Sequence, residues 1–91
     1  MITVYKYPLD MSEDQWVKIP TCAHLLHVGM QDGTPMLWAQ VDTEFDMYEY
    51  QFGVFGTGHP MPMSGIYIGT FTSHADQLVW HVFNIGQRPC Q

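Results

Sequence analysis

Residues 23–42, AHLLHVGMQDGTPMLWAQVD, carry the strongest fold signal of the chain. Two largely apolar runs, Ala23 to Gln31 and Pro35 to Asp42, flank the dipeptide Asp32-Gly33. This dipeptide tolerates positive φ at both central positions of a type I′ turn, a turn favoured in two-residue hairpin loops. The segment therefore predicts a β-hairpin.

The rest of the chain continues this β pattern. Short segments rich in β-branched and aromatic residues are separated by Gly, Pro, Asp and Ser. The other predicted strands are Ile2 to Tyr7, Gln15 to Ile19, Met47 to Phe55, Ile66 to Thr72 and Leu78 to Ile85. No segment has helical apolar spacing over three turns, so at most one short helical turn is expected, at residues 12–15. The prediction is an all-β fold, a small antiparallel barrel or sandwich of six to seven strands.

Length and composition set the class of protein. A chain of 91 residues predicts a single domain, residues 1–91. Nine Asp and Glu residues against three Lys and Arg give a net charge of −6. This charge disfavours a nucleic-acid polymer or an anionic membrane as partner, because both are bound through clusters of Lys and Arg. With no apparent signal peptide, an intracellular protein is expected, and Cys22 and Cys90 are expected to be reduced thiols.

The predicted strand from Leu78 to Ile85 is apolar on both faces. One face carries Leu78, Trp80 and Val82. The other face carries Val79, Phe83 and Ile85. Such a strand is covered on both sides, and in a small domain one cover can be another subunit. A homo-oligomer is therefore expected.

The segment from Gly56 to His59 is the first candidate binding site. It begins a link of about ten residues, longer than the two to five residues of a usual hairpin loop. Gly56 and Gly58 allow an anion close to backbone N–H groups, and Thr57 and His59 add side-chain donors. The alternative is a wide turn in which these glycines only supply positive φ.

Histidine and aromatic side chains supply the other candidates. His27 and His81 are potential donors to a polar ligand, and Trp38 and Tyr67 are potential stacking surfaces for a nucleobase. No metal site is expected. His24 and His27 are three apart on a predicted strand, which places them on opposite faces.

Acidic residues gather between Asp42 and Glu49. If this stretch is extended, Asp42, Glu44 and Asp46 share one side and form an acidic edge that prevents unwanted strand pairing. Alternatively, the stretch imitates nucleic-acid phosphates or docks on a basic protein surface. No cofactor motif or nucleophile elbow is present, so an enzyme is not expected.

Several blocks of the chain carry a family resemblance between about residue 2 and residue 86. They are Thr3-Val4-Tyr5-Lys6-Tyr7-Pro8-Leu9, Ile19-Pro20, Leu26-His27-Val28-Gly29-Met30-Gln31 with Leu37-Trp38-Ala39, Gly56-Thr57-Gly58-His59-Pro60, Tyr67-Ile68-Gly69-Thr70, and Val79-Trp80-His81-Val82-Phe83. Their order and spacing resemble an uncharacterised family of proteins of similar length encoded by tailed bacteriophages and prophages. The resemblance implies a phage protein in the host bacterial cytoplasm.

By analogy with other small accessory phage proteins, an inhibitor of anti-phage immunity is expected. The first mechanism is a sponge that sequesters a nucleotide immune signal, a cyclic dinucleotide or ADP-ribose derivative, in a pocket between subunits. Trp38 or Tyr67 would stack on the base, the Gly56 to His59 loop would contact phosphate, and His27 or His81 would add polar contacts. The alternatives are an acidic protein-binding inhibitor that mimics nucleic acid, and a structural or regulatory phage role.

Overall fold

The computed structural model describes residues 1–73 and 77–90 and consists of seven strands. They are β1 (Ile2–Pro8), β2 (Gln15–Pro20), β3 (His24–Gln31), β4 (Thr34–Asp42), β5 (Met47–Gly56), β6 (Ile66–Ser73) and β7 (Leu78–Pro89). The all-β prediction is confirmed. Every predicted strand end lies within about one residue of the observed end except that of β7, which continues from Ile85 to Pro89. The described part of the chain contains no helix long and apolar enough to cross a membrane.

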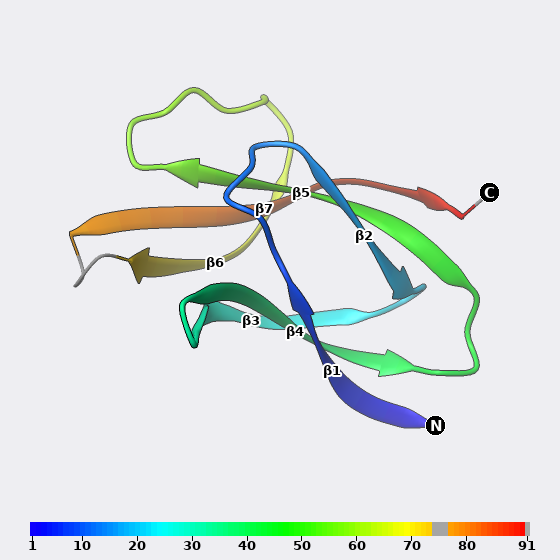
Figure 1. The fold of residues 1–91 in the computed structure, drawn as a ribbon. Helices are drawn as coiled ribbons and strands as arrows, with labels where there is room; N and C mark the ends of the chain where they lie inside the picture. The colour runs from blue at the N-terminus through cyan, green and yellow to red at the C-terminus, as the bar shows by residue number, and fades with distance from the viewer. Residues whose placement is uncertain (74–76, 91) are drawn as a thin grey trace.

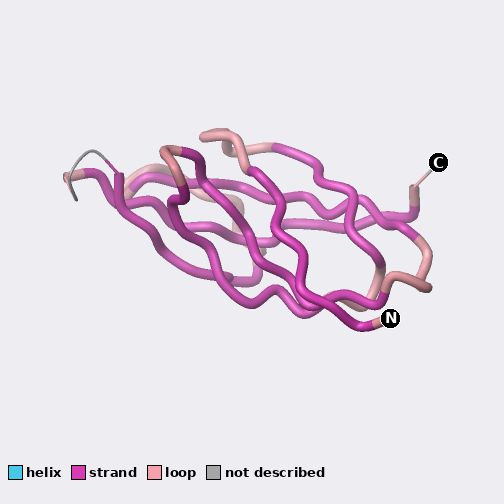
Figure 2. Tube along the Cα trace, turned by 60° about the horizontal axis from the view of Figure 1, so that its bottom comes forward, coloured by secondary structure: helices cyan, strands magenta, loops and turns pink. Residues whose placement is uncertain are grey.

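The strands form two antiparallel sheets that pack as a sandwich (Figure 1). The three-stranded sheet has the order β1-β4-β3, and the four-stranded sheet has the order β2-β5-β7-β6. The strands run along the long dimension of the molecule (Figure 2). At one side of the sandwich, β3 and β6 approach closely: a Cβ on Gly69 would lie 2.7 Å from Cγ2 of Val28. Glycine at this position therefore allows the two sheet edges to meet.

The core lies between the two sheets and follows the alternation of each strand. The side chains that fill it include Leu37, Ala39 and Val41 of β4, Tyr50, Phe52 and Val54 of β5, and Val82 of β7. Tyr50, Phe52 and Val54 are spaced two residues apart, which places all three on the inner face of β5. The hairpin between β3 and β4 is also confirmed, because Asp32 and Gly33 both have positive φ, 52° and 80°, as a type I′ turn requires.

The connection from β5 to β6 differs from a hairpin. Both strands pair antiparallel with β7, so they run parallel to each other on its two sides. Residues 57–65 must therefore return past β7 before β6 begins, as the chain does in Figure 1. At the end of this crossover, a Cβ on Gly65 would lie 3.3 Å from Ile85 and 3.6 Å from Phe83. The crossover itself thus covers part of the β7 face for which a second subunit was expected.

Candidate functional site

The turn that opens the crossover is shaped by Gly58. The N–H of His59 donates to the carbonyl of Gly56 at 3.0 Å, and Gly58 has a φ of +87°. The N–H of Thr57 donates to the carbonyl of Val79 at 3.3 Å. These two N–H groups are therefore engaged within the chain, and the side chains of Thr57 and His59 are the candidate side-chain donors to a phosphate.

A row of polar side chains crosses the outer face of the four-stranded sheet beside this turn. Thr57 Oγ1 lies 2.8 Å from Nε2 of His81, and Thr70 Oγ1 lies 3.1 Å from Nδ1 of the same ring. The hydroxyl of Tyr67 lies 2.6 Å from Thr70 Oγ1. Hydroxyls can donate to one ring nitrogen and accept from the other, so the imidazole is held in place at both ends. The structure thus brings three predicted site residues, Thr57, Tyr67 and His81, into one hydrogen-bonded row.

His59 lies on the other side of the turn and packs against Trp80. The two rings meet edge to face, with centroids 6.5 Å apart and planes at 80°. A Cβ on Gly56 would lie 3.0 Å from Cε1 of His59, so the turn leaves little room for a side chain at residue 56. His59 Nδ1 is also 4.0 Å from the carboxylate of Glu13, and both side chains are exposed. These contacts set the histidine at the end of the sandwich beside an indole ring.

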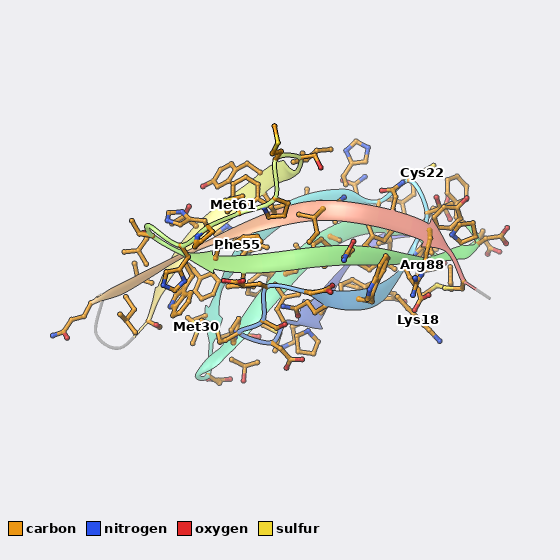
Figure 3. All side chains as sticks on the ribbon, turned by 90° about the horizontal axis from the view of Figure 1, so that it is seen from above. Lys18, Cys22, Met30, Phe55, Met61 and Arg88 are labelled. Atoms are coloured by element: carbon orange, nitrogen blue, oxygen red, sulfur yellow. The ribbon has the colours of Figure 1, made fainter. Side chains whose placement is uncertain are left out.

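Two cavities border Trp80. The larger has a volume of about 430 Å³ and opens at the end of the sandwich, where it is lined by Met11, Met30 (labelled in Figure 3), Gly33, Pro35, Ser73 and Trp80. The smaller, of about 340 Å³, is lined by Gly56, Thr57, His59, Gln77, Leu78, Val79 and Trp80. Both volumes fall within the roughly 300–1,000 Å³ range of small-molecule sites. The Nε1–H of Trp80 donates to Ser73 Oγ at 2.9 Å, which fixes the orientation of the indole between them.

Trp38 and His27 lie elsewhere, on the outer face of the three-stranded sheet. Trp38 alternates with buried Leu37 and Ala39, so its ring points away from the core. His27 pairs with it across the strands, and their ring centroids are 5.6 Å apart. The eight predicted site residues therefore form two groups: His27 and Trp38 lie on the outer face of the three-stranded sheet, and the other six lie at the turn after β5 and on the outer face of the four-stranded sheet. One subunit cannot bring both groups to a single ligand.

The predicted orientation of His24 and His27 is wrong. A β-bulge between Leu25 and His27 inserts Leu26 into β3, and this shifts the alternation by one residue. His24 then faces Gln40 and His27 faces Trp38, so both histidines lie on the outer face. Even so, no group of three metal-ligating side chains occurs in residues 1–73 and 77–90. Cys22 and Cys90 are free thiols, and His74 lies outside the described residues.

The prediction of an extended acidic edge is also wrong. Residues 43–46 form the turn that carries the chain from β4 in one sheet to β5 in the other. Asp42 Oδ1 accepts a hydrogen bond from the backbone N–H of Glu44 at 3.0 Å, which bends the chain. The carboxylates are therefore arranged around a turn, together with the exposed ring of Phe45.

Asp42 makes this turn sensitive to pH. The Glu44 N–H and the terminal ammonium of Met1, 3.2 Å away, hold the pKa of Asp42 below its ordinary value of 3.8. A depressed pKa contributes stability that is present above the ordinary value and is lost as the pH falls through the depressed one. Asp42→Asn should therefore lower the melting temperature at pH 7, and this difference should shrink in melts below pH 3.8. Glu44→Gln is the control, because it keeps the N–H that donates to Asp42. A difference that persists unchanged at low pH would contradict the assignment.

The larger cavity beside Trp80 could not be predicted from the sequence. Met11, Met30 and Pro35 come from separate loops and strand ends, and no local pattern joins them. Trp80 shares an apolar face with Val82 and packs against the core. Its position near the start of β7, on the face that continues inward to Val82, is the sequence feature that places it at the rim of the sandwich.

Comparison of the sequence with known proteins assigns the chain to a family. A family model described as a domain of unknown function (DUF7352) matches residues 1–89. No curated protein and no solved structure matches the chain. Because the matched region spans almost the whole chain, the protein belongs to the DUF7352 family, a domain family of unknown function.

Proposed function

We propose that this protein is a non-enzymatic binding protein that captures a small nucleotide beside Trp80. The observation that carries the proposal is the pair of cavities, about 430 and 340 Å³, that border a single fixed indole. An indole face stacks on any nucleobase, and such stacking contributes about 1–3 kcal/mol per base. Thr57 and His59 line the smaller cavity and are within reach as donors to a phosphate or sugar.

The lack of Lys and Arg around the two cavities limits the negative charge that a ligand can carry. None of the described residues that line the two cavities is Lys or Arg. Neutral donors hold an anion less strongly than charged ones. A ligand with one or two negative charges, such as a cyclic dinucleotide or an ADP-ribose derivative, therefore fits better than a nucleoside triphosphate. A second subunit in a homo-oligomer would add further contacts.

The biological role that we propose for this binding is the evasion of bacterial immunity by a phage. The family resemblance described above supports a phage or prophage protein in the host bacterial cytoplasm. There it would sequester a nucleotide signal of anti-phage immunity and so allow evasion of that immunity. Sequestration requires only binding, which agrees with a site built from an indole, two methionines and neutral donors.

Release of an intact ligand tests the proposal. The purified protein is incubated with a mixture of cyclic dinucleotides, linear nucleotides and ADP-ribose derivatives, freed of unbound ligand by ultrafiltration, and denatured by heat. Mass spectrometry should recover one species intact from the denatured protein. Recovery of a converted product would indicate an enzyme, and no depletion of any species would rule out the sponge.

An acidic protein-binding inhibitor is the second candidate, favoured by the turn after β4. The large apolar side chains of Phe45 and Met47 are exposed there beside the carboxylates of Asp42, Glu44 and Asp46. An apolar anchor with a charged rim is typical of protein interfaces. Phe45→Ala would then abolish binding to a basic defence protein and leave nucleotide capture unchanged.

A further inference from the structure

The outer edge of β1 carries backbone groups without a partner strand. β1 is an edge strand and pairs with β4 alone among the described strands. At the two ends of this ladder, the N–H of Thr43 donates to Met1 and the N–H of Leu9 donates to Pro35. Backbone groups in an antiparallel ladder point alternately to the partner strand and away from it. The odd-numbered residues of β1 therefore bond to β4, and the even-numbered residues point outward.

Ile2, Val4 and Lys6 are these outward-pointing residues, and no strand in the described part of the chain pairs with their N–H and C=O groups. Their side chains also lie on the outer face of the sheet, where Ile2 is 66% exposed and Val4 is 51% exposed. Tyr5 points to the inner side of the sheet and is still 45% exposed. An apolar edge with unpaired backbone groups is a template for another strand, and natural monomers usually protect such edges.

We propose that β1 pairs antiparallel with β1 of a second copy, centred on Val4, to form a homodimer. In this register Val4 of one copy faces Val4 of the other, and Ile2 faces Lys6. Each facing pair exchanges two hydrogen bonds, so every outward N–H and C=O of the three residues finds a partner. On the inner side, Tyr5 of each copy faces Thr3 of the other.

Charge favours a second copy as the occupant of this edge. Each chain has a net charge of −6, so two copies repel over most of their surface. β1 contains Lys6 and no carboxylate, and in the proposed register the two lysines face isoleucines instead of each other. The interface thus joins the acidic subunits at an edge without acidic side chains.

The outer edge of β2, in the four-stranded sheet, lacks this self-complementarity. The N–H of Thr21 donates to Asp46, so Trp16, Lys18 and Pro20 are the residues that point outward from β2. Pro20 has no N–H to donate. Antiparallel pairing centred on Lys18 would place two lysines directly opposite each other, which is destabilising.

The proposed dimer joins the outer faces of two three-stranded sheets into one continuous sheet. Lys6 faces Trp38 across the strands, and its Nζ donates to Gln31 of β3 at 2.7 Å. The combined face would therefore carry Lys6, Trp38 and His27 from both copies. This inference does not rest on the proposed function, because it concerns backbone groups of β1, and no residue of β1 lines the two cavities beside Trp80.

A charge exchange at Val4 tests the register. V4K and V4E place like charges opposite each other, and each variant alone should raise the dimer dissociation constant about 100-fold or more in sedimentation experiments. An equimolar mixture of V4K and V4E should restore the dimer, because Lys then faces Glu. Leu26→Lys, at a 50% exposed site on β3 of the same sheet, is the matched control and should leave dimerisation unchanged.

Circular dichroism verifies that each variant remains folded. If a charge at residue 4 prevents folding, Val4→Pro is the second variant, because it removes an N–H that points away from β4. It should weaken the dimer and preserve the β spectrum. A wild-type protein that is monomeric across the micromolar range, a dimeric V4K, or a mixture that stays monomeric would each overturn the proposal.

Discussion

Replacing Phe52 with alanine should lower the free energy of unfolding by about 3–5 kcal/mol. Phe52 lies in the middle of β5, and its side chain is completely buried between the sheets. Its ring stacks on Tyr50, with centroids 6.3 Å apart and planes at 12°. Removing the ring deletes apolar contacts and leaves a cavity that the paired strands cannot close. Chemical denaturation followed by tryptophan fluorescence measures the change.

Phe45→Ala is the matched control for this experiment. It removes the same side chain from the turn between β4 and β5, where the ring is 46% exposed. Its effect should stay within about 0.5 kcal/mol, as for most surface substitutions. Equal losses for Phe52→Ala and Phe45→Ala would contradict the assignment of Phe52 to the centre of the core.

Replacing Trp80 with alanine should weaken nucleotide binding by about 5- to 150-fold, the fold-change that corresponds to the loss of one stacked base. Trp80 borders both cavities, so its loss removes the wall that they share. Isothermal titration with the species identified by mass spectrometry measures the dissociation constant. Because Trp80 also packs against the core, the melting temperature of the variant is recorded, and titrations are run well below it.

Trp38→Ala separates this site from the other aromatic surface. Trp38 is on the outer face of the three-stranded sheet, and its replacement should leave the dissociation constant unchanged. Full binding by Trp80→Ala together with lost binding by Trp38→Ala would move the site to the face that carries His27 and Lys6. That result would contradict the site at Trp80 and leave the sponge hypothesis itself standing.

Local chemistry was sufficient to predict the strands. Runs of β-branched and aromatic residues identified the strands, and the Asp32-Gly33 pair identified the hairpin, since both signals depend only on neighbours in the chain. The choice of a sandwich over a barrel depends on which edges stay unpaired. That choice is made by long-range packing such as the close approach of Gly69 to Val28.

Strand order and the site were harder to predict, because both also depend on packing between residues that are distant in the sequence. The Gly56 to His59 segment begins a link longer than a usual hairpin loop, but nothing within it shows that the chain crosses β7 to reach β6. The bulge at Leu26 turned His24 onto the face of His27, and a bulge shifts every subsequent residue without a strong sequence signal. Trp80, Met11 and Met30 become neighbours only when both sheets are assembled.

The position of β7 between β5 and β6 has a consequence for how the chain acquires its structure. Both neighbours of β7 precede it in the sequence, so the four-stranded sheet cannot close until residues 78–89 have been synthesised. Until then, β5 and β6 have no shared partner and the apolar inner face of β5 is incompletely covered. Folds dominated by such distant pairings form slowly. We therefore expect β6 to join the four-stranded sheet only after β7 has left the ribosome, although the β1-β4-β3 sheet has all its strands earlier.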